Sequence, residues 1–181
     1  MTGSAPIIRP AASGDLKAVA DIYAHYVRHT VATFEETPWP VAAWQRRLDE
    51  LAGGDLPFVI AELSGEVAGF AYAGPWRPKP AYRHTVEDTI YLAPGFTGRG
   101  LGAPLLESVV TGAARAGMRT MIAVIADTGS EASAALHRRF GFTDVGLLTD
   151  VGYKHGRWVD TLLMQRSLNL QGRADDRSGG S

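Results

Sequence analysis

Apolar residues recur along the chain with two different periods, and these periods predict an alternating order of helices and strands. Steps of three and four residues predict helices, whereas short apolar runs predict strands. The helices are expected over residues 15–29, 41–51, 101–116 and from 128 or 130 to 140. The strands are expected over residues 7–10, 57–62, 66–73, 84–92, 119–125, 142–153 and 158–164. This order favours an α/β (α+β) fold with a mixed, partly parallel central sheet and helices on both faces.

Local signals predict how two of these helices begin. Ser13 precedes the first helix and is expected to be its N-cap. Thr128 and Glu131 have the spacing of a capping box ahead of the last helix, and Ser130 is a further candidate cap.

Length and composition fit one globular domain, since 45% of the 181 residues are hydrophobic and 20% are charged. We expect this domain to span residues 1–169 and the polar, Gly- and Ser-rich residues 170–181 to form a disordered tail.

The absence of cysteine excludes disulfides, thiolate nucleophiles and cysteine-ligated zinc. A net charge of −1 gives no support to a nucleic-acid partner. No apolar run approaches the roughly 20 residues of a membrane helix, and the first residues lack a signal-peptide pattern, so we expect a cytoplasmic protein without a membrane partner.

A glycine-rich loop between the strand at 84–92 and the helix at 101–116 carries the strongest chemical signal. It contains Gly98, Gly100 and Gly102. Glycines allow backbone amides to gather and a ligand to approach closely. The start of the following helix adds unpaired N–H groups and a partial positive charge, a combination suited to a pyrophosphate. Arg99 can add charge from the rim of this loop.

Two other interpretations of this loop remain open. A glycine-rich turn that only starts a helix is common in proteins. Gly98, Gly100 and Ala103 also satisfy the dinucleotide-binding pattern, with Asp127 near the expected offset. Against a dinucleotide site, residues 94–97 lie between the strand and Gly98, and no second βαβ half follows.

The stretch 89–102 resembles the first cofactor-binding motif of the GNAT N-acetyltransferases. Gly100 and Gly102 match that motif, whereas Thr97 stands where the family carries Gln or Arg. Segments 69–76, 85–87, 136–142 and 154–160 are similar, in order and spacing, to the phosphinothricin and methionine sulfoximine acetyltransferase subfamily. The resemblance covers roughly residues 7 to 169.

The resemblance implies an enzyme that moves an acetyl group from acetyl-CoA to the α-amino group of a small amino acid. Phosphinothricin, methionine sulfoximine and methionine sulfone are the expected acceptors, with direct attack by the amine, no metal and a homodimeric enzyme. A different small amine, a non-catalytic acyl-CoA-binding module and a dinucleotide-binding protein remain as alternatives. The cofactor-binding residues implied are Ile90, Tyr91, Leu92, Thr97, Gly98, Arg99, Gly100, Leu101, Gly102, Ala103 and Ser130.

Two residues are implied as catalytic. An α-amine with a pKa of about 8 or higher is largely protonated at neutral pH, so the reaction benefits from a base. Glu87 occupies the position of the proposed base in the subfamily. His137 is expected to protonate the departing CoA thiolate or to assist Glu87. The alternatives are a surface glutamate and a capping or surface histidine.

Two arginines and three aromatic residues are candidates for acceptor binding. Arg77 and Arg83 precede the strand at 84–92, and a guanidinium can bind a carboxylate or phosphinate with two hydrogen bonds. Phe34, Trp76 and Tyr82 are candidate walls of the acceptor pocket. Solvated arginines and core aromatics are the competing interpretations.

One pair of histidines has the spacing of metal ligands. His25 and His29 stand four residues apart on the first helix. They lack the glutamate of a zinc-protease motif and a third ligand, so we expect no metal.

Overall fold

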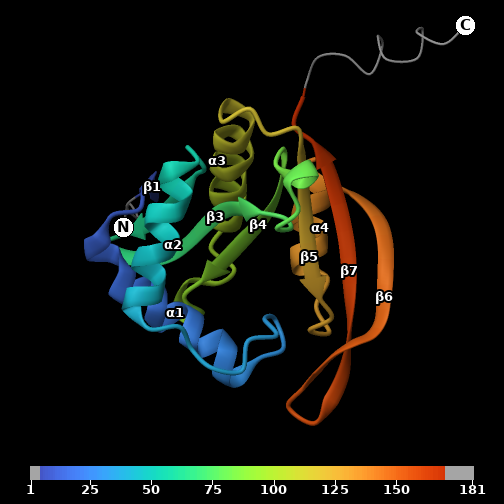
Figure 1. The fold of residues 1–181 in the computed structure, drawn as a ribbon. Coiled ribbons are helices and arrows are strands. Elements are labelled where there is room, and N and C mark those ends of the chain that lie inside the picture. The colour runs from blue at the N-terminus through green and yellow to red at the C-terminus, as the bar shows by residue number, and fades with distance from the viewer. Residues whose placement is uncertain (1–4, 170–181) are drawn as a thin grey trace, which may run out of the picture.

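A computed structural model describes residues 5–169, and its centre is a seven-stranded sheet (Figure 1). The strand order across the sheet is β1-β2-β3-β4-β5-β7-β6. Only β4 and β5 are parallel, and every other neighbouring pair is antiparallel. The strands are β1 (Ile7–Pro10), β2 (Phe58–Leu63), β3 (Glu66–Pro75), β4 (Thr85–Leu92), β5 (Thr120–Ala126), β6 (Thr143–Lys154) and β7 (Arg157–Ser167). The predicted mixed sheet and element order are therefore confirmed.

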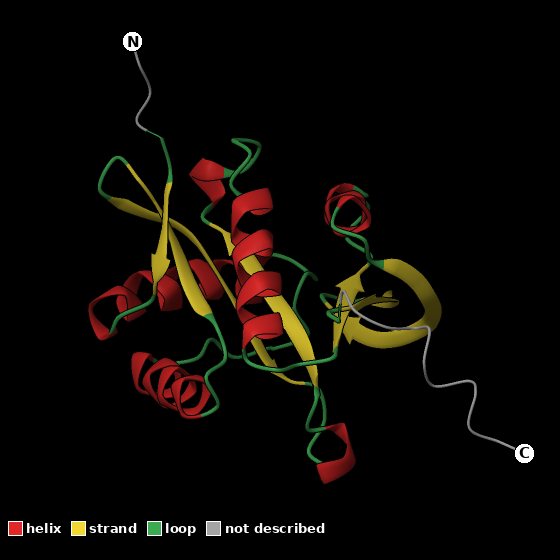
Figure 2. Ribbon diagram, turned by 90° about the horizontal axis from the view of Figure 1, so that it is seen from above, coloured by secondary structure: helices red, strands yellow, loops and turns green. Residues whose placement is uncertain are grey.

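Four helices cover the two faces of the sheet, as the view from above shows (Figure 2). Helices α1 (Leu16–His29) and α2 (Val41–Gly53) lie on one face, and α3 (Gly102–Arg115) and α4 (Ala132–Arg139) lie on the other. Alternate residues of β2 show why two cores form. Phe58 and Ile60 pack with α1 and α2, whereas Val59 and Ala61 pack with α3, because successive strand side chains point to opposite faces.

The predicted N-cap of the first helix is wrong. Ser13 begins a 3₁₀ turn, and α1 begins at Leu16. The Asp15 carboxylate accepts a hydrogen bond from the Ala12 amide at 2.8 Å and forms an ion pair with Arg9 at 2.8 Å. The Asp15 carboxylate therefore binds both an amide and a guanidinium just before α1. The Ser13 hydroxyl makes no cap hydrogen bond.

The predicted capping box at the last helix is also wrong. Helix α4 begins at Ala132, and Glu131, at its N-cap, makes no side-chain cap bond. The Ser130 hydroxyl accepts a hydrogen bond from the Ala132 amide at 3.3 Å, so the short loop before α4 is held by serine.

The parallel strands β4 and β5 pair over three residues and then separate. Their shared register ends at Glu87 and Ile122. β4 continues to Leu92 beside β3, while β5 continues to Ala126 beside β7. Beyond Glu87, β4 and β5 therefore no longer pair through backbone hydrogen bonds, and a cleft opens between their facing edges.

Strands β6 and β7 form a long hairpin at the other edge of the sheet (Figure 1). Its turn lies at His155 and Gly156, which both have positive φ. Two register shifts in β6 bend the hairpin. Its large exposed apolar side chains are Val145, Leu147, Leu148, Val151, Tyr153 and Trp158.

Two further expectations concern the chain outside this sheet. The tail expected over residues 170–181 lies outside the described residues. Among residues 5–169, every helix is too short or too polar to span a bilayer.

Candidate active site

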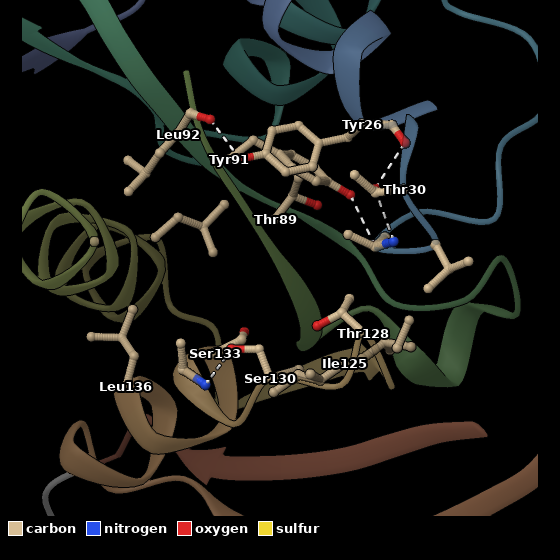
Figure 3. Close-up of a pocket in the computed structure, with 18 of the residues that line it drawn as sticks. Tyr26, Thr30, Thr89, Tyr91, Leu92, Ile125, Thr128, Ser130, Ser133 and Leu136 are labelled. Atoms are coloured by element: carbon tan, nitrogen blue, oxygen red, sulfur yellow. Dashed lines mark hydrogen bonds between the residues drawn. The ribbon is translucent and has the colours of Figure 1, made fainter. Parts of the chain in front are cut away.

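A cavity of 1040 Å³ occupies the cleft between β4 and β5. Figure 3 shows Tyr26, Thr89 and Tyr91 along one wall and Ser130, Ser133 and Leu136 along the other. The first wall belongs to α1 and β4, and the second to the loop before α4 and to α4 itself. The strand separation after Glu87 therefore creates a slot with the edge of β4 on one side.

Side chains of β4 alternate between two different surroundings. Glu87, Thr89 and Tyr91 face α1 and α2, where they line a second cavity of 410 Å³. Val86 and Asp88 face α3 and α4. The second cavity is completed by Tyr23, Thr33, Phe34, Glu35, Trp39 and Tyr72. Glu87, Thr89 and Tyr91 line both cavities, so the two cavities adjoin along this part of β4.

The Glu87 carboxylate has the electrostatics of a proton acceptor. Burial raises its pKa to about 7, and the negative charge of neighbouring Asp88 adds to this shift. No hydrogen bond or ion pair holds this carboxylate among residues 5–169. A carboxyl group with a pKa near neutrality can take a proton from an ammonium group and release it again. The interpretation as an ordinary solvated glutamate does not fit this environment.

His137 lies on the opposite face of β4 from Glu87, and both of its ring nitrogens are engaged. Nε2 lies 2.9 Å from Oδ2 of Asp88, and Nδ1 lies 2.7 Å from the carbonyl oxygen of Ser133. The residue is 2% exposed, so the interpretation as a surface histidine is wrong. Neither nitrogen contacts Glu87, and the direct assistance to Glu87 expected from sequence therefore finds no contact to support it.

The contacts of His137 favour its protonated form. Both ring nitrogens face oxygen atoms that accept hydrogen bonds, so each needs a proton when Asp88 is ionised. Burial lowers the pKa of His137, but the hydrogen bond and charge of Asp88, with the Ser133 carbonyl, outweigh burial and raise it. The other Asp88 oxygen, Oδ1, is buried and finds no partner within residues 5–169. His137 and Asp88 are thus a buried, hydrogen-bonded pair in the wall of the larger cavity, and Asp88 raises the pKa of the histidine.

The glycine loop takes the backbone conformation that its composition predicts. Gly98 and Gly100 have φ of 72° and 77°, a region that favours glycine. Thr97 donates its hydroxyl to the Pro94 carbonyl at 3.1 Å, so its side chain braces the loop. The Arg99 guanidinium lies over the Phe96 ring at 5.1 Å.

Some of the predicted cofactor residues line the larger cavity and others do not. Ile90, Tyr91, Leu92, Thr97, Gly98, Gly102 and Ser130 line it. Arg99, Gly100, Leu101 and Ala103 are absent from its wall, and Leu101 is buried in the core. The Leu92 carbonyl accepts a hydrogen bond from the Tyr26 hydroxyl at 2.6 Å, so this oxygen already has a partner within the protein.

The predicted acceptor residues are divided in the same way. Phe34 lines the smaller cavity, whereas Arg77, Arg83, Trp76 and Tyr82 line neither. Arg77 stacks on Trp76 at 5.1 Å, and Arg83 donates to the Pro80 carbonyl at 3.2 Å. Their role in acceptor binding stays a prediction.

Several residues of the site were missed by sequence reasoning. Asp88 directly follows Glu87, and strand alternation alone would have placed it on the opposite face. Its contact with His137 spans 49 positions and leaves no local signal. Tyr72 and Trp39 were assigned to no site, yet both line the smaller cavity. Tyr26 was likewise assigned to no site, yet it lines the larger cavity.

The histidine pair on α1 is not joined by further metal-binding side chains. His25 and His29 have ring centroids 5.1 Å apart. Among residues 5–169, no three side chains of His, Cys, Asp or Glu are grouped as they would be around a metal ion.

Comparisons with known proteins agree on one family. Residues 19–142 match the model of the acetyltransferase (GNAT) family. Phosphinothricin N-acetyltransferase of Alcaligenes faecalis is 42% identical over 90% of this chain and 82% of its own. L-methionine sulfoximine/L-methionine sulfone acetyltransferase of Pseudomonas paraeruginosa is 39% identical over 90% of this chain and 94% of its own. A crystal structure of a GNAT superfamily phosphinothricin acetyltransferase from Sinorhizobium meliloti in complex with AcCoA superposes with a TM-score of 0.87 at 42% identity, covering 92% of this chain and 90% of that one.

Proposed function

The chain belongs to the acetyltransferase (GNAT) family, and we propose that it transfers the acetyl group of acetyl-CoA to the α-amino group of a small amino acid of the phosphinothricin or methionine sulfoximine type. One observation carries this proposal: Glu87, with a pKa of about 7, lies where the larger and the smaller cavity meet. A thioester in one cavity and an amine in the other would meet at this carboxylate. The names of the related enzymes support the choice of acceptor.

The larger cavity is proposed to hold acetyl-CoA. The Gly98 and Gly100 amides and the start of α3 would bind its pyrophosphate, because helix N-termini and glycine-rich backbone favour anions. The unpaired edge of β4 from Ile90 to Leu92 would bind the pantetheine arm, with Ser130 on the other wall. The AcCoA-bound relative supports this assignment. We also propose a cytoplasmic enzyme, since acetyl-CoA has to be present where the protein works.

Direct attack follows from the groups that line the site. Glu87 takes a proton from the acceptor ammonium, and the free amine attacks the thioester carbonyl. The N–C bond forms, the C–S bond breaks, and the thiolate of CoA leaves. The attacking nitrogen loses its second proton as the amide forms, the thiolate takes up one proton, and Glu87 releases the other to solvent. Of the two roles expected for His137, we favour protonation of that thiolate. His137 lines the larger cavity on the opposite face of β4 from Glu87, and to reach the sulfur its Nε2–H or Nδ1–H would have to leave Asp88 or Ser133.

The smaller cavity is proposed to bind the acceptor. Its volume of 410 Å³ suits a small amino acid. Phe34 forms part of its wall. We keep Arg77 and Arg83 as the proposed partners of the acidic groups of the acceptor, with Trp76 and Tyr82 beside them. Arg77→Ala should then raise the KM for the acceptor much more than the KM for acetyl-CoA.

We further propose that the enzyme is a homodimer. The β6–β7 hairpin exposes a group of large apolar side chains, which soluble monomers rarely leave open. A second copy of the chain is the partner that the family resemblance implies. Light scattering on the purified protein tests this proposal, and a monomeric mass at micromolar concentration would contradict it.

Acetyl-CoA-dependent thiol release tests the proposed reaction on a panel of acceptors. The panel contains phosphinothricin, methionine sulfoximine, methionine sulfone, ordinary amino acids and simple polyamines. The chain has no cysteine, so the protein itself adds no background to a thiol reagent. Turnover of one of the first three acceptors, lost in Glu87→Gln, is the expected result.

Other outcomes of the panel separate the parts of the proposal. Turnover of a different amine alone would keep the chemistry and overturn the acceptor class. Thermal stabilisation by acetyl-CoA without turnover of any acceptor would favour a binding module. Stabilisation by NAD but not by acetyl-CoA would overturn the assignment of the larger cavity.

A further inference from the structure

Two contacts join the tip of the β6–β7 hairpin to the segment after α1. Lys154 donates from Nζ to the Thr33 carbonyl at 2.7 Å, although 121 positions separate these residues. The Phe34 ring packs directly on the backbone of Gly152. Thr33 and Phe34 line the smaller cavity, whereas Gly152 and Lys154 do not. The hairpin thus contacts the wall of that cavity from behind.

Gly152 and Lys154 occupy the same face of β6. They stand two positions apart and both are buried, while Val151 and Tyr153 are exposed on the opposite face. The end of β6 therefore presents one face to the segment after α1 and the other to the outside.

Space, rather than backbone conformation, explains the glycine at position 152. Its φ is not positive, so an alanine would meet no backbone strain there. A Cβ at this position would lie 2.3 Å, 2.4 Å and 2.8 Å from three atoms of the Phe34 ring. Gly146, in the same strand, offers a contrast, since a Cβ there would meet no atom within 4 Å. Only at Gly152 does the missing side chain make room for an aromatic ring.

Lys154 fixes the backbone beside that ring. The side chain is buried, with 4% of the residue exposed, and burial lowers its pKa. Glu35 and Glu36, the nearest acidic groups, oppose this shift. A buried ammonium that loses its acceptor is costly, so the bond to the Thr33 carbonyl resists displacement of the segment.

We propose that Gly152 and Lys154 are positioning residues that set the shape of the acceptor cavity by holding Phe34 and Thr33. Acceptor selectivity then depends on two hairpin residues that line neither cavity. This inference rests on the proposed function in one respect, the assignment of the smaller cavity to the acceptor.

Gly152→Ala should change acceptor binding selectively. The added methyl group must displace the Phe34 ring, which belongs to a residue that is 41% exposed. We expect the acceptor KM to change by about tenfold or more, as pocket changes of one methyl-sized group typically do. The KM for acetyl-CoA should stay within about twofold, because the cleft beside the glycine loop is untouched. The ranking of acceptors on the panel should also change.

Gly146→Ala is the matched control, since it adds the same methyl group to the same strand without a steric contact. It should leave both KM values and the acceptor ranking unchanged. Equal effects of Gly152→Ala and Gly146→Ala, or equal changes in both KM values, would overturn the proposal.

A double-mutant cycle with Phe34→Ala assigns the effect to the ring. Once the ring is removed, Gly152→Ala should change the acceptor KM by less than about twofold relative to Phe34→Ala alone. A full effect that persists without the ring would contradict the proposal. If Gly152→Ala yields no folded protein, the double variant Phe34→Ala/Gly152→Ala should still fold, because the ring that clashes is gone. A double variant that does not fold would mean that position 152 acts through another contact.

Lys154→Met gives a second and independent measurement. It removes the bond to Thr33 and keeps much of the side-chain volume, so the acceptor KM should rise while acetyl-CoA still stabilises the protein thermally. An unchanged acceptor KM would overturn the role of Lys154. If the wild-type protein turns over only an unrelated amine, the proposed acceptor class is wrong, but the same comparison of variants on that amine still tests the hairpin.

Discussion

Glu87 and Asp88 are neighbours in the chain, yet the two faces of β4 give them different surroundings. Glu87 is partly buried without a partner, and its pKa rises to about 7. Asp88 is 8% exposed and lies 2.9 Å from a histidine whose pKa is raised. Burial alone disfavours a carboxylate charge, whereas burial beside a cation maintains it. The comparison shows how adjacent carboxyl groups can serve proton transfer and charge pairing at the same time.

The two faces also differ in what they contact. The Glu87 face opens onto the smaller cavity, while the Asp88 face is closed by α4. Through His137, the Asp88 face ties α4, in the wall of the larger cavity, to the strand that carries Glu87. Loss of Glu87 should therefore affect the reaction, and loss of Asp88 should affect the fold first.

The largest expected effect is on turnover, from Glu87→Gln. This change keeps the size of the side chain and removes its ability to accept a proton. We expect kcat to fall by about 10²- to 10⁴-fold, the range typical of general-base catalysis. Steady-state kinetics at pH 8 with saturating acetyl-CoA measures this effect. A fall of less than about threefold would remove Glu87 from the role of base.

The same variant should not be less stable than the wild-type protein at pH 8. The folded-state pKa of Glu87 lies above its ordinary value of 4.5, so folding binds a proton between those two values. The stability contributed by the protonated form is lost as pH rises through about 7. A neutral glutamine avoids the buried charge that remains above this pH. A marked loss of stability in Glu87→Gln would indicate a structural role instead.

The second largest effect is on folding, from Asp88→Asn. The change removes the carboxylate from its buried pair with His137, and breaking a buried pair by removing one partner costs about 3–5 kcal/mol. Urea unfolding at pH 7 measures the loss. Asp144→Asn is the control, because Asp144 and Arg138 form an exposed pair that solvent and salt screen, and its effect should be much smaller. Equal losses in the two variants would contradict the charge pair on the Asp88 face.

The sequence alone could predict those features of the fold that depend on local patterns. Period-two and helical patterns are local, so the order of strands and helices and the glycine loop were predictable. Glu87 was identified through the family resemblance around it. The Arg9–Asp15 pair that replaces the expected Ser13 cap depends on how β1 leads into α1.

Contacts between distant segments left no such pattern. The Asp88–His137 pair joins a strand to a helix 49 positions later, and Lys154 meets Thr33 across 121 positions. The helical pattern alone placed His137 near the end of a short helix, where a surface position was a reasonable alternative. Only the packing of α4 against β4 decides that this histidine is buried and paired with Asp88.

The smallest expected effect is a shift in the pH dependence of the reaction. In the wild-type protein, kcat/KM for the acceptor should rise with pH through an apparent pKa of about 7, because only ionised Glu87 can accept the proton. Asp88 is the second cause of that raised pKa, so Asp88→Asn should move this limb to lower pH by less than about one unit. Tyr72 also faces Glu87, and its own pKa is raised by burial, so it stays neutral over this range. Any alkaline limb due to His137 should move to lower pH as well, because the same substitution removes the carboxylate that raises its pKa.

Using one acceptor for both proteins cancels the titration of the acceptor amine. Identical pH profiles would mean that the two faces of β4 do not communicate electrostatically, and an acid limb near the ordinary glutamate pKa in both proteins would mean that Glu87 is not the group that titrates.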